Sequence, residues 1–417
     1  MAGRLHARSA LIVVLVAVVT VLWLGPRLRS AARPTDFDRE MARIDDDLAA
    51  LGPHALESPD TATRLAFRLY HRATLTARAD DFATVQTIAD RALDRWPIAD
   101  IRLLRATVDL RFHRLEDARR NLDPIGDAGG DDVQLLLADI ALQSGAAAEA
   151  RRRVDAVVAR HPTWDARSRL AWMLARDGDI EGADRQYAEA EADLTAKEMR
   201  ACAWVELQWG QMYFARGRYE LARGHYDRAR RAYSGYWLHD EYEAELLGAV
   251  RDFDHAVARY QDAIARAPRP DLFQQLGDLY LAMGRPAQAR EWHDRALSGY
   301  LASVKRGEVQ FLHHLAAFYS DVRPDGAEAV RWAQQDRQLR PNHVSEDTLA
   351  WALYRNGQVA AALEASSRAL EGRDVDAHML FHGATINDAA GRQDEAGRLR
   401  GRLLSMNPRY EDFHAHR

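Results

Sequence analysis

The sequence predicts an all-α fold, a solenoid of about ten antiparallel helix pairs. Three observations predict it. A pattern of small and apolar residues recurs about every 33 or 34 residues, which is typical of helical repeats. Within each unit, a small residue stands where two helices would cross, and a glycine often follows where the chain would reverse. The 13 prolines fall before the repeats, near unit boundaries or at the start of a second helix, where a missing N–H costs little.

Composition limits the classes of function. The chain has 417 residues, of which 47% are hydrophobic and 29% charged, so it has enough apolar surface for a core. Its formal net charge of −5 lacks the basic excess of a nucleic-acid binder, and no nucleic-acid partner is predicted. The single cysteine, Cys202, excludes a disulfide within the chain and argues against a cysteine-based zinc site. Its small neighbours indicate a buried helical residue rather than a nucleophile.

Residues 1–26 form the first predicted segment, a signal peptide or a signal-anchor transmembrane helix. Residues 10–24 are apolar apart from Thr20, and arginines flank them on both sides. At 1.5 Å per residue this run spans roughly 22 Å, short of the ~30 Å hydrocarbon core of a bilayer. Because the only candidate cleavage site, Ser30-Ala31-Ala32, is weak, we favour an uncleaved membrane anchor with the body exported to the periplasmic or extracellular side. Secretion after cleavage and a cytoplasmic body are the alternatives.

Residues 27–60 form a linker that contains one short helix. Met41, Ile44, Leu48 and Leu51 recur at spacings of three and four, which places them on one face of a helix. We expect this helix to cap the first repeat. A coiled-coil seam between two copies is the alternative, although two heptads are too few to establish it.

Residues 61–417 form the repeat array. Residues 169–183 and 348–362 share Leu-Ala-Trp, a following Leu, an Arg, the turn Gly and a final Ala. Residues 210–222 and 277–289 share Gly, Tyr, Ala, Gly-Arg and a final Ala. Small side chains let two helices approach closely, and a glycine just past the first helix can take the positive φ that reverses the chain. A proline then ends the second helix.

Three units depart from the regular spacing. One needs a single extra residue near Asp325. Two others are longer than the rest, and their additional length lies around residues 193–201 and 298–307. Because both stretches keep a helical composition, we expect lengthened second helices there rather than loops.

The array resembles the tetratricopeptide repeat family. The unit at residues 271–300 carries the resemblance through Leu276, Gly277, Tyr280, Ala289 and Ala296. Residues 203–236 carry it again, and the likeness covers roughly residues 61–417. Together with the N-terminal segment, the order of motifs also resembles that of bacterial membrane-anchored or exported repeat proteins. The resemblance implies a right-handed superhelix whose concave groove, lined by the first helix of each unit, holds a peptide or a partner helix.

No motif for catalysis or cofactor binding appears in the sequence. It contains no phosphate loop, no H-E-x-x-H zinc motif and no G-x-S-x-G nucleophile elbow. His378 and His382 lie one helical turn apart and could in principle bind a metal, but packing and groove positions are the preferred interpretation. We therefore predict no catalytic, cofactor or metal site, and no small-molecule substrate.

Candidate groove residues follow from the helical geometry. In each first helix, the residue just after the small position and those three or four residues away are expected to face the concave side. Aromatic residues mixed with polar ones suit a peptide-binding surface, although the same aromatics could pack between helices. The predicted groove residues are Trp172, Trp204, Leu207, Gln211, Phe214, Gln274, Asp278, Gln310, His313, Asp347, Trp351, Tyr354, His378, Phe381 and Asp388.

The predicted function is that of a scaffold, not an enzyme, that binds a peptide or a partner protein in this groove at the membrane or in the cell envelope. A self-assembling structural module of the envelope is the second hypothesis. An enzyme whose site the motifs do not reveal is the third.

Overall fold

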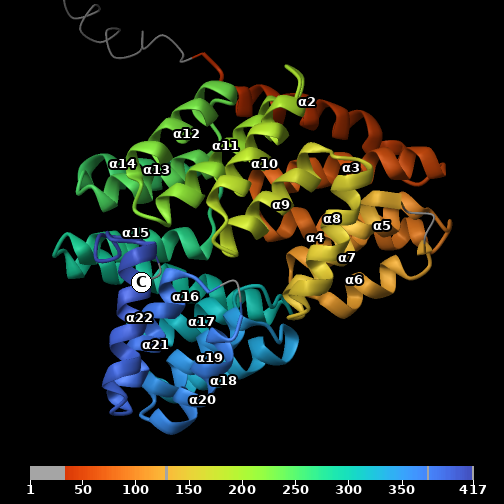
Figure 1. Cartoon of the computed structure of the whole chain (residues 1–417). Coiled ribbons are helices and arrows are strands. Elements are labelled where there is room, and N and C mark those ends of the chain that lie inside the picture. The colour runs from red at the N-terminus through yellow and green to blue at the C-terminus, as the bar shows by residue number, and fades with distance from the viewer. Residues whose placement is uncertain (1–32, 127–129, 373–374, 416–417) are drawn as a thin grey trace, which may run out of the picture.

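The computed structural model describes residues 33–126, 130–372 and 375–415, and the regular structure within them is helical throughout. After α2 (Asp36–Leu51) and the short η1 (Gly52–His54), these residues form ten helix pairs (Figure 1). The pairs are α3 (Pro59–Thr76) with α4 (Ala79–Leu93), α5 (Ala99–Arg111) with α6 (Leu115–Leu122), α7 (Gly130–Gln143) with α8 (Ala147–Arg160), α9 (Trp164–Arg176) with α10 (Ile180–Asp193), α11 (Met199–Phe214) with α12 (Tyr219–Ala232), α13 (Trp237–Ala249) with α14 (Phe253–Arg266), α15 (Pro270–Ala282) with α16 (Pro286–Lys305), α17 (Leu312–Ala317) and η3 (Phe318–Val322) with α18 (Gly326–Leu339), α19 (His343–Arg355) with α20 (Val359–Leu370), and α21 (Ala377–Ala389) with α22 (Gln393–Met406).

The predicted small positions lie where the two helices of a pair cross. A Cβ added to Gly210 would lie 2.5 Å from the Tyr226 ring, so α11 and α12 touch at a point where no side chain fits. Gly277 meets the ring of His293 in the same way. The turn glycines also behave as predicted, with Gly178 at a φ of 88° and Gly357 at 76°. In other units Ala77, His113 and Arg251 take the positive φ instead.

The three irregular units are accommodated in different ways. The expected long second helix is confirmed in α16, which has 20 residues. At residues 193–201 the expectation is wrong, because α10 ends at Asp193 and the chain turns before α11. There Glu198 accepts hydrogen bonds from the backbone and hydroxyl of Thr195, which gives the backbone an alternative to the helix. The extra residue of the eighth pair is absorbed by η3, a turn of π-helix, which accommodates one residue without breaking the helix.

The linker helix does more than cap the first pair. As predicted for the apolar stripe, Ile44 is buried, and Met41 and Leu48 pack beside it. Its N-terminus, however, lies against the turn between α12 and α13, where the backbone N–H of Phe37 donates to the carbonyl of Ser234. Helix α2 therefore joins the first pair to the fifth and sixth pairs.

Helix pairs that lie far apart in the sequence meet at three further places. The indole Nε1 of Trp237 donates to the carbonyl of Leu75 at 2.9 Å. The Asn342 amide donates to the carbonyl of Gln143, also at 2.9 Å. A third joint holds the C-terminal segment against α12 and α13. Residues that lie far apart in the sequence are thus neighbours, and these contacts bring distant pairs together across the concave side.

The predicted signal or anchor, residues 1–26, lies outside the described residues. Among the helices that the structure describes, none has both the length and the apolar character needed to cross a membrane.

Candidate functional site: a concave chamber

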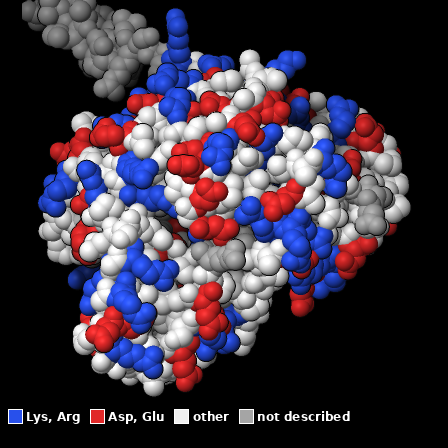
Figure 2. All heavy atoms as spheres, in the orientation of Figure 1, with Lys and Arg blue, Asp and Glu red and all other residues white. Residues whose placement is uncertain are grey.

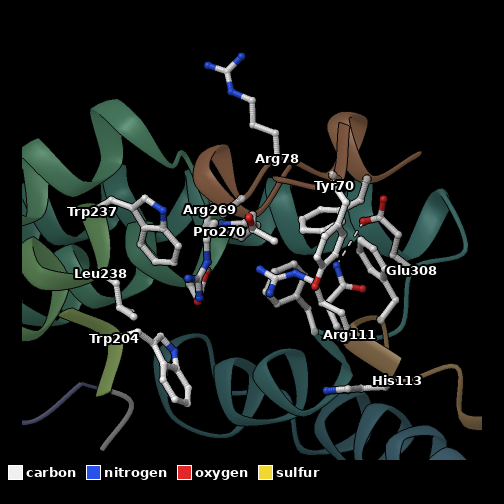
Figure 3. A pocket seen from close by; sticks show the side chains of 18 of the residues that line it. Tyr70, Arg78, Arg111, His113, Trp204, Trp237, Leu238, Arg269, Pro270 and Glu308 are labelled. Atoms are coloured by element: carbon white, nitrogen blue, oxygen red, sulfur yellow. Dashed lines mark hydrogen bonds and ion pairs between the residues drawn. The ribbon is translucent and has the colours of Figure 1, made fainter. Parts of the chain in front are cut away.

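The array borders a partly open chamber of about 1440 Å³ on its concave side. Its walls come mainly from first helices of the pairs, including α3, α5, α9 and α11, and from the starts of α13, α15 and α17. Figure 3 shows side chains from these distant segments turned toward the same space. The chamber therefore exists only because the array closes.

Aromatic rings form much of the wall. Trp164 and Trp204 meet edge to face with ring centroids 6.1 Å apart. Trp172, two turns further along α9 from Trp164, remains 37% exposed. Trp237 is buried, and its indole N–H is bonded to the Leu75 carbonyl. Partly exposed indoles such as that of Trp172 can bury apolar groups of a ligand and still donate a hydrogen bond.

Most charges on the wall are already paired. Arg169 binds Asp139 at 2.9 Å, and Arg306 binds Glu308 at 2.8 Å. Arg269 pairs with Asp271, and its guanidinium also lies 5.0 Å from the centre of the Trp237 ring. These pairs neutralise one another and leave little net charge for a ligand.

Three charged side chains on the wall form no ion pair with a described residue: Arg78 and Asp80 at the start of α4, and Arg111. Of the three, it is Arg111 that packs on an aromatic ring. Its side chain, at the end of α5, is exposed to the chamber, and its guanidinium lies 4.7 Å from the centre of the Phe82 ring. No described carboxylate forms an ion pair with it. Desolvation and the nearby Arg269 lower the pKa of Arg111, and Tyr70, Tyr236 and Asp271 oppose this shift only in part. An anionic group that entered the chamber would relieve this cost.

Two clusters contain side chains that could ligate a metal. His113, His313 and Asp336 place ligand atoms within 4.8 Å of one another, but Arg340 already binds Asp336 at 2.7 Å and lies 3.3 Å from His313. A guanidinium thus occupies the place of the cation. In the second cluster, on α13, Arg259 binds Glu243 at 2.8 Å, so the same objection holds for His239 and Asp240. Neither set suits a metal.

The predicted groove residues fall into three groups. Trp172, Trp204, Gln310 and His313 line the chamber. Gln211, Phe214 and His378 line a second cavity of about 430 Å³, which Trp172 also borders. The other eight residues line neither cavity: Leu207, Gln274, Asp278, Asp347, Trp351, Tyr354, Phe381 and Asp388.

Within the third group, three side chains are buried. Leu207 is fully buried, and Gln274 is 2% exposed with its carbonyl oxygen accepting from the Tyr300 hydroxyl. Both side chains pack between helices, because a step of three or four residues also reaches the edge of the helix that faces the next helix. Asp347 is likewise buried, where it contacts His382 at 2.9 Å.

The remaining members of that group make contacts near the protein surface. Asp278 contacts His293 and Asp388 pairs with Arg400. Trp351 donates to Asp321 at 2.7 Å. The last contacts are between rings: Tyr354 with Trp351, and Phe381 with Tyr410.

His378 and His382 contact each other and other residues through their rings. Their rings meet edge to face, with centroids 4.1 Å apart. His378 contacts the Tyr410 hydroxyl, and His382 stacks on Trp351. Burial lowers the pKa of His382 to about 3, so this imidazole is neutral.

Sequence reasoning missed Arg111 and Trp237. Arg111 lies in the first two units, where the repeat pattern is weakest. Nothing in the sequence distinguishes it from the paired arginines, because the groups that surround it come from other pairs. The one available signal is that an arginine at a helix end next to aromatic residues can project into a groove.

The fold and the chamber define a class: a helical-repeat solenoid that closes around its concave face. The tetratricopeptide repeat family matches residues 135–198, which cover most of α7 and all of α8–α10. That match supports the resemblance seen in the repeats. No curated protein matches the sequence.

Several solved structures share the helical arrangement loosely. Cut9–Hcn1 of an APC/C hetero-tetramer is 16% identical, with a TM-score of 0.43 over 83% of this chain and 74% of the other. A human IFIT1 dimer with m7Gppp-AAAA is 14% identical, with a TM-score of 0.46 over 82% and 81%. Yeast Tom70 is 14% identical, with a TM-score of 0.40 over 88% and 89%. These values are too low to transfer a partner or an activity.

Proposed function

We propose that this chain is a protein-binding scaffold that encloses an extended segment of a partner protein in the concave chamber. One observation carries the proposal: Arg111, which has no ion-pair partner, faces a space whose other walls include partly exposed indoles. Aromatic and arginine side chains in a desolvated pocket dominate the energetics of protein interfaces. Tetratricopeptide repeats, which residues 135–198 resemble, generally bind proteins.

The charge pattern favours a peptide over a nucleic acid. A polyphosphate backbone needs a continuous basic track, and its binding depends on many cations. In the chamber, carboxylates pair with most of the arginines, and the guanidinium of Arg111 has no ion-pair partner. On the face of the molecule that Figure 2 displays, both signs of charge are interspersed without a basic stripe. One carboxylate on a partner segment could form an ion pair with Arg111. A run of phosphates would instead be repelled by the carboxylates of Asp139, Asp271 and Glu308.

Affinity capture with matched variants tests the proposal. The full-length chain, solubilised in mild detergent, is expected to retain a partner that the combined variant Arg111→Gln, Trp172→Ala, Trp204→Ala loses. The control carries Arg185→Gln, Leu221→Ala and Leu404→Ala, which are exposed outside the chamber, and it is expected to retain the partner. Circular dichroism establishes that both variants are folded. Equal retention by all three proteins refutes the chamber as the binding site.

The setting of the scaffold is part of the proposal. Residues 1–26 are proposed to anchor the chain in a membrane with the repeats exported, and secretion after cleavage is the alternative. Protease protection of the repeats in intact cells, compared with disrupted cells, distinguishes an exported from a cytoplasmic body. A self-assembling envelope module becomes the preferred function if the purified chain captures only itself.

A further inference from the structure

The C-terminal segment, residues 407–415, leaves α22 and crosses to α12 and α13, which lie much earlier in the chain. It begins at Asn407, whose side-chain oxygen accepts from the backbone N–H of Arg409. Arg409 then lies over the Tyr219 ring, 4.9 Å from its centre. From here the segment runs along the surface of the fifth and sixth pairs as a peptide ligand would.

Three contacts hold the end of the segment. The Tyr219 hydroxyl donates to the Asp412 carboxylate at 3.2 Å. The Phe413 ring lies on Gly248 of α13 so closely that a Cβ there would come within 2.5 Å of it. The backbone N–H of Ala415 donates to Glu245 at 2.9 Å. Phe413 nevertheless stays half-buried, whereas Tyr410 nearer the start of the segment is buried in the core, so it is residues 412–415 that cover this surface from outside.

This surface continues into the chamber. The cavity of about 430 Å³ is bounded on one side by Tyr410, His414 and Ala415 of the segment. On the other side it is bounded by Trp172, Tyr187 and Gln208, which also line the chamber. A partner segment that leaves the chamber in this direction meets the surface that the C-terminal segment covers.

We propose that the surface formed by Tyr219, Glu245 and Gly248 is a docking site for a partner segment in which an acidic residue is followed directly by an aromatic one. In the structure, the chain's own C-terminal segment occupies this site. The proposal rests on the proposed function, because it assigns a second, adjoining surface to the same scaffold. The required chemistry is read from the occupant.

Each feature of the site selects one feature of the ligand. A phenol hydroxyl donates to a carboxylate. A glycine on a helix offers a flat area for a ring, and any larger residue would block it. The Glu245 carboxyl accepts one backbone N–H two residues beyond the ring. A partner with this pattern makes the same contacts, so the two segments exclude each other.

The test uses the full-length chain and a fluorescent peptide of residues 411–417. In the wild-type chain the attached segment competes at an effective concentration of about millimolar, so the peptide binds weakly. The variant Asp412→Ala, Phe413→Ala frees the surface, and we expect it to bind the peptide at least tenfold more tightly. A glycine-based peptide that keeps only the Asp, Phe and Ala is expected to bind as well, and a version with Asp and Phe replaced by Ala is not. Arg402→Ala, exposed on α22, is the control and should behave as the wild type.

Every other outcome overturns the proposal. Equal binding to both chains places the peptide elsewhere, and binding to neither removes the docking site. If the wild-type chain forms dimers by exchanging C-terminal segments, a second copy is the occupant instead of a partner. Should the double variant fail to fold, Phe413→Ala alone is tested in the same way. The capture experiment on the chamber leaves the C-terminal segment intact, so one proposal can fail while the other stands.

Discussion

The closure of the array predicts that two equivalent glycines respond differently to the same substitution. Gly145 and Gly178 each follow the first helix of their pair, and both have positive φ, at 81° and 88°. A Cβ on Gly178 meets nothing within 4 Å, whereas a Cβ on Gly145 would overlap the backbone carbonyl of Pro341. Pro341 adjoins Asn342, which binds the carbonyl of Gln143 across the joint.

The expected magnitudes follow from these two environments. An alanine in the left-handed region costs about 1–2 kcal/mol, and Gly178→Ala should lose that amount. Gly145→Ala bears the same cost and also forces two backbones apart. Overpacking of this kind adds about 1–3 kcal/mol, and the loss of the Asn342 hydrogen bond about 1 kcal/mol. We therefore expect Gly145→Ala to be more destabilising than Gly178→Ala by about 2–4 kcal/mol.

Urea denaturation followed by circular dichroism measures the difference. In a repeat array each pair is stabilised by its neighbours, so different pairs can unfold separately. Hydrogen exchange therefore measures the stability of each helix individually. Gly145→Ala should raise exchange at the start of α19, far away in the sequence, and Gly178→Ala should leave it unchanged. Equal losses of stability, or unchanged exchange at α19 in both variants, would show that this joint does not form in solution.

Three further predictions concern single side chains. Trp237→Phe leaves the Leu75 carbonyl without its donor and is expected to cost about 1–3 kcal/mol in thermal unfolding, whereas Trp292→Phe, which makes ring contacts only, should cost less. Burial raises the pKa of Glu245 to about 7, so the folded state favours its neutral form. The contribution of this group to the free energy of unfolding is present at low pH and is lost as the pH rises from the ordinary pKa of 4.5 to about 7. In unfolding curves measured over this pH range, Glu245→Gln should lose less stability than the wild type. Partial burial and neighbouring glutamates raise the pKa of the Cys202 thiol to about 11. Its reaction with a disulfide reagent at pH 8 should be about a hundredfold slower than that of free cysteine, and an equal rate would contradict the raised pKa.

Much of the fold was predictable because the repeat signal is local. Crossing positions such as Gly210 and Gly277 work within a single pair, and one repeat contains both partners of the contact. The turn glycines depend only on their own φ, which is why Gly178 and Gly357 could be assigned from spacing. The error at residues 193–201 has a local cause too, since the bonds between Thr195 and Glu198 compete with helix formation.

The candidate site was only partly predictable. Helical geometry placed Trp172, Trp204, Gln310 and His313 on the concave side, where they line the chamber. The same rule selected Leu207 and Gln274, which are buried, because the periodicity of one helix does not reveal which of its edges the next helix covers. Arg111 could not be singled out at all. Whether an arginine is paired depends on which carboxylates the fold brings near it.

The sequence alone determined that about ten helix pairs follow one another and where several of them cross, since each crossing depends on contacts inside one repeat. The tertiary structure decided the rest. A small rotation between successive pairs accumulates along the array, and its sum determines whether the groove stays open or closes. Here Trp237 reaches Leu75, Asn342 reaches Gln143 and the C-terminal segment reaches Glu245, so the concave face becomes a chamber with an unpaired arginine inside. Contacts between residues so far apart follow from the summed geometry of all the pairs, which no single repeat encodes.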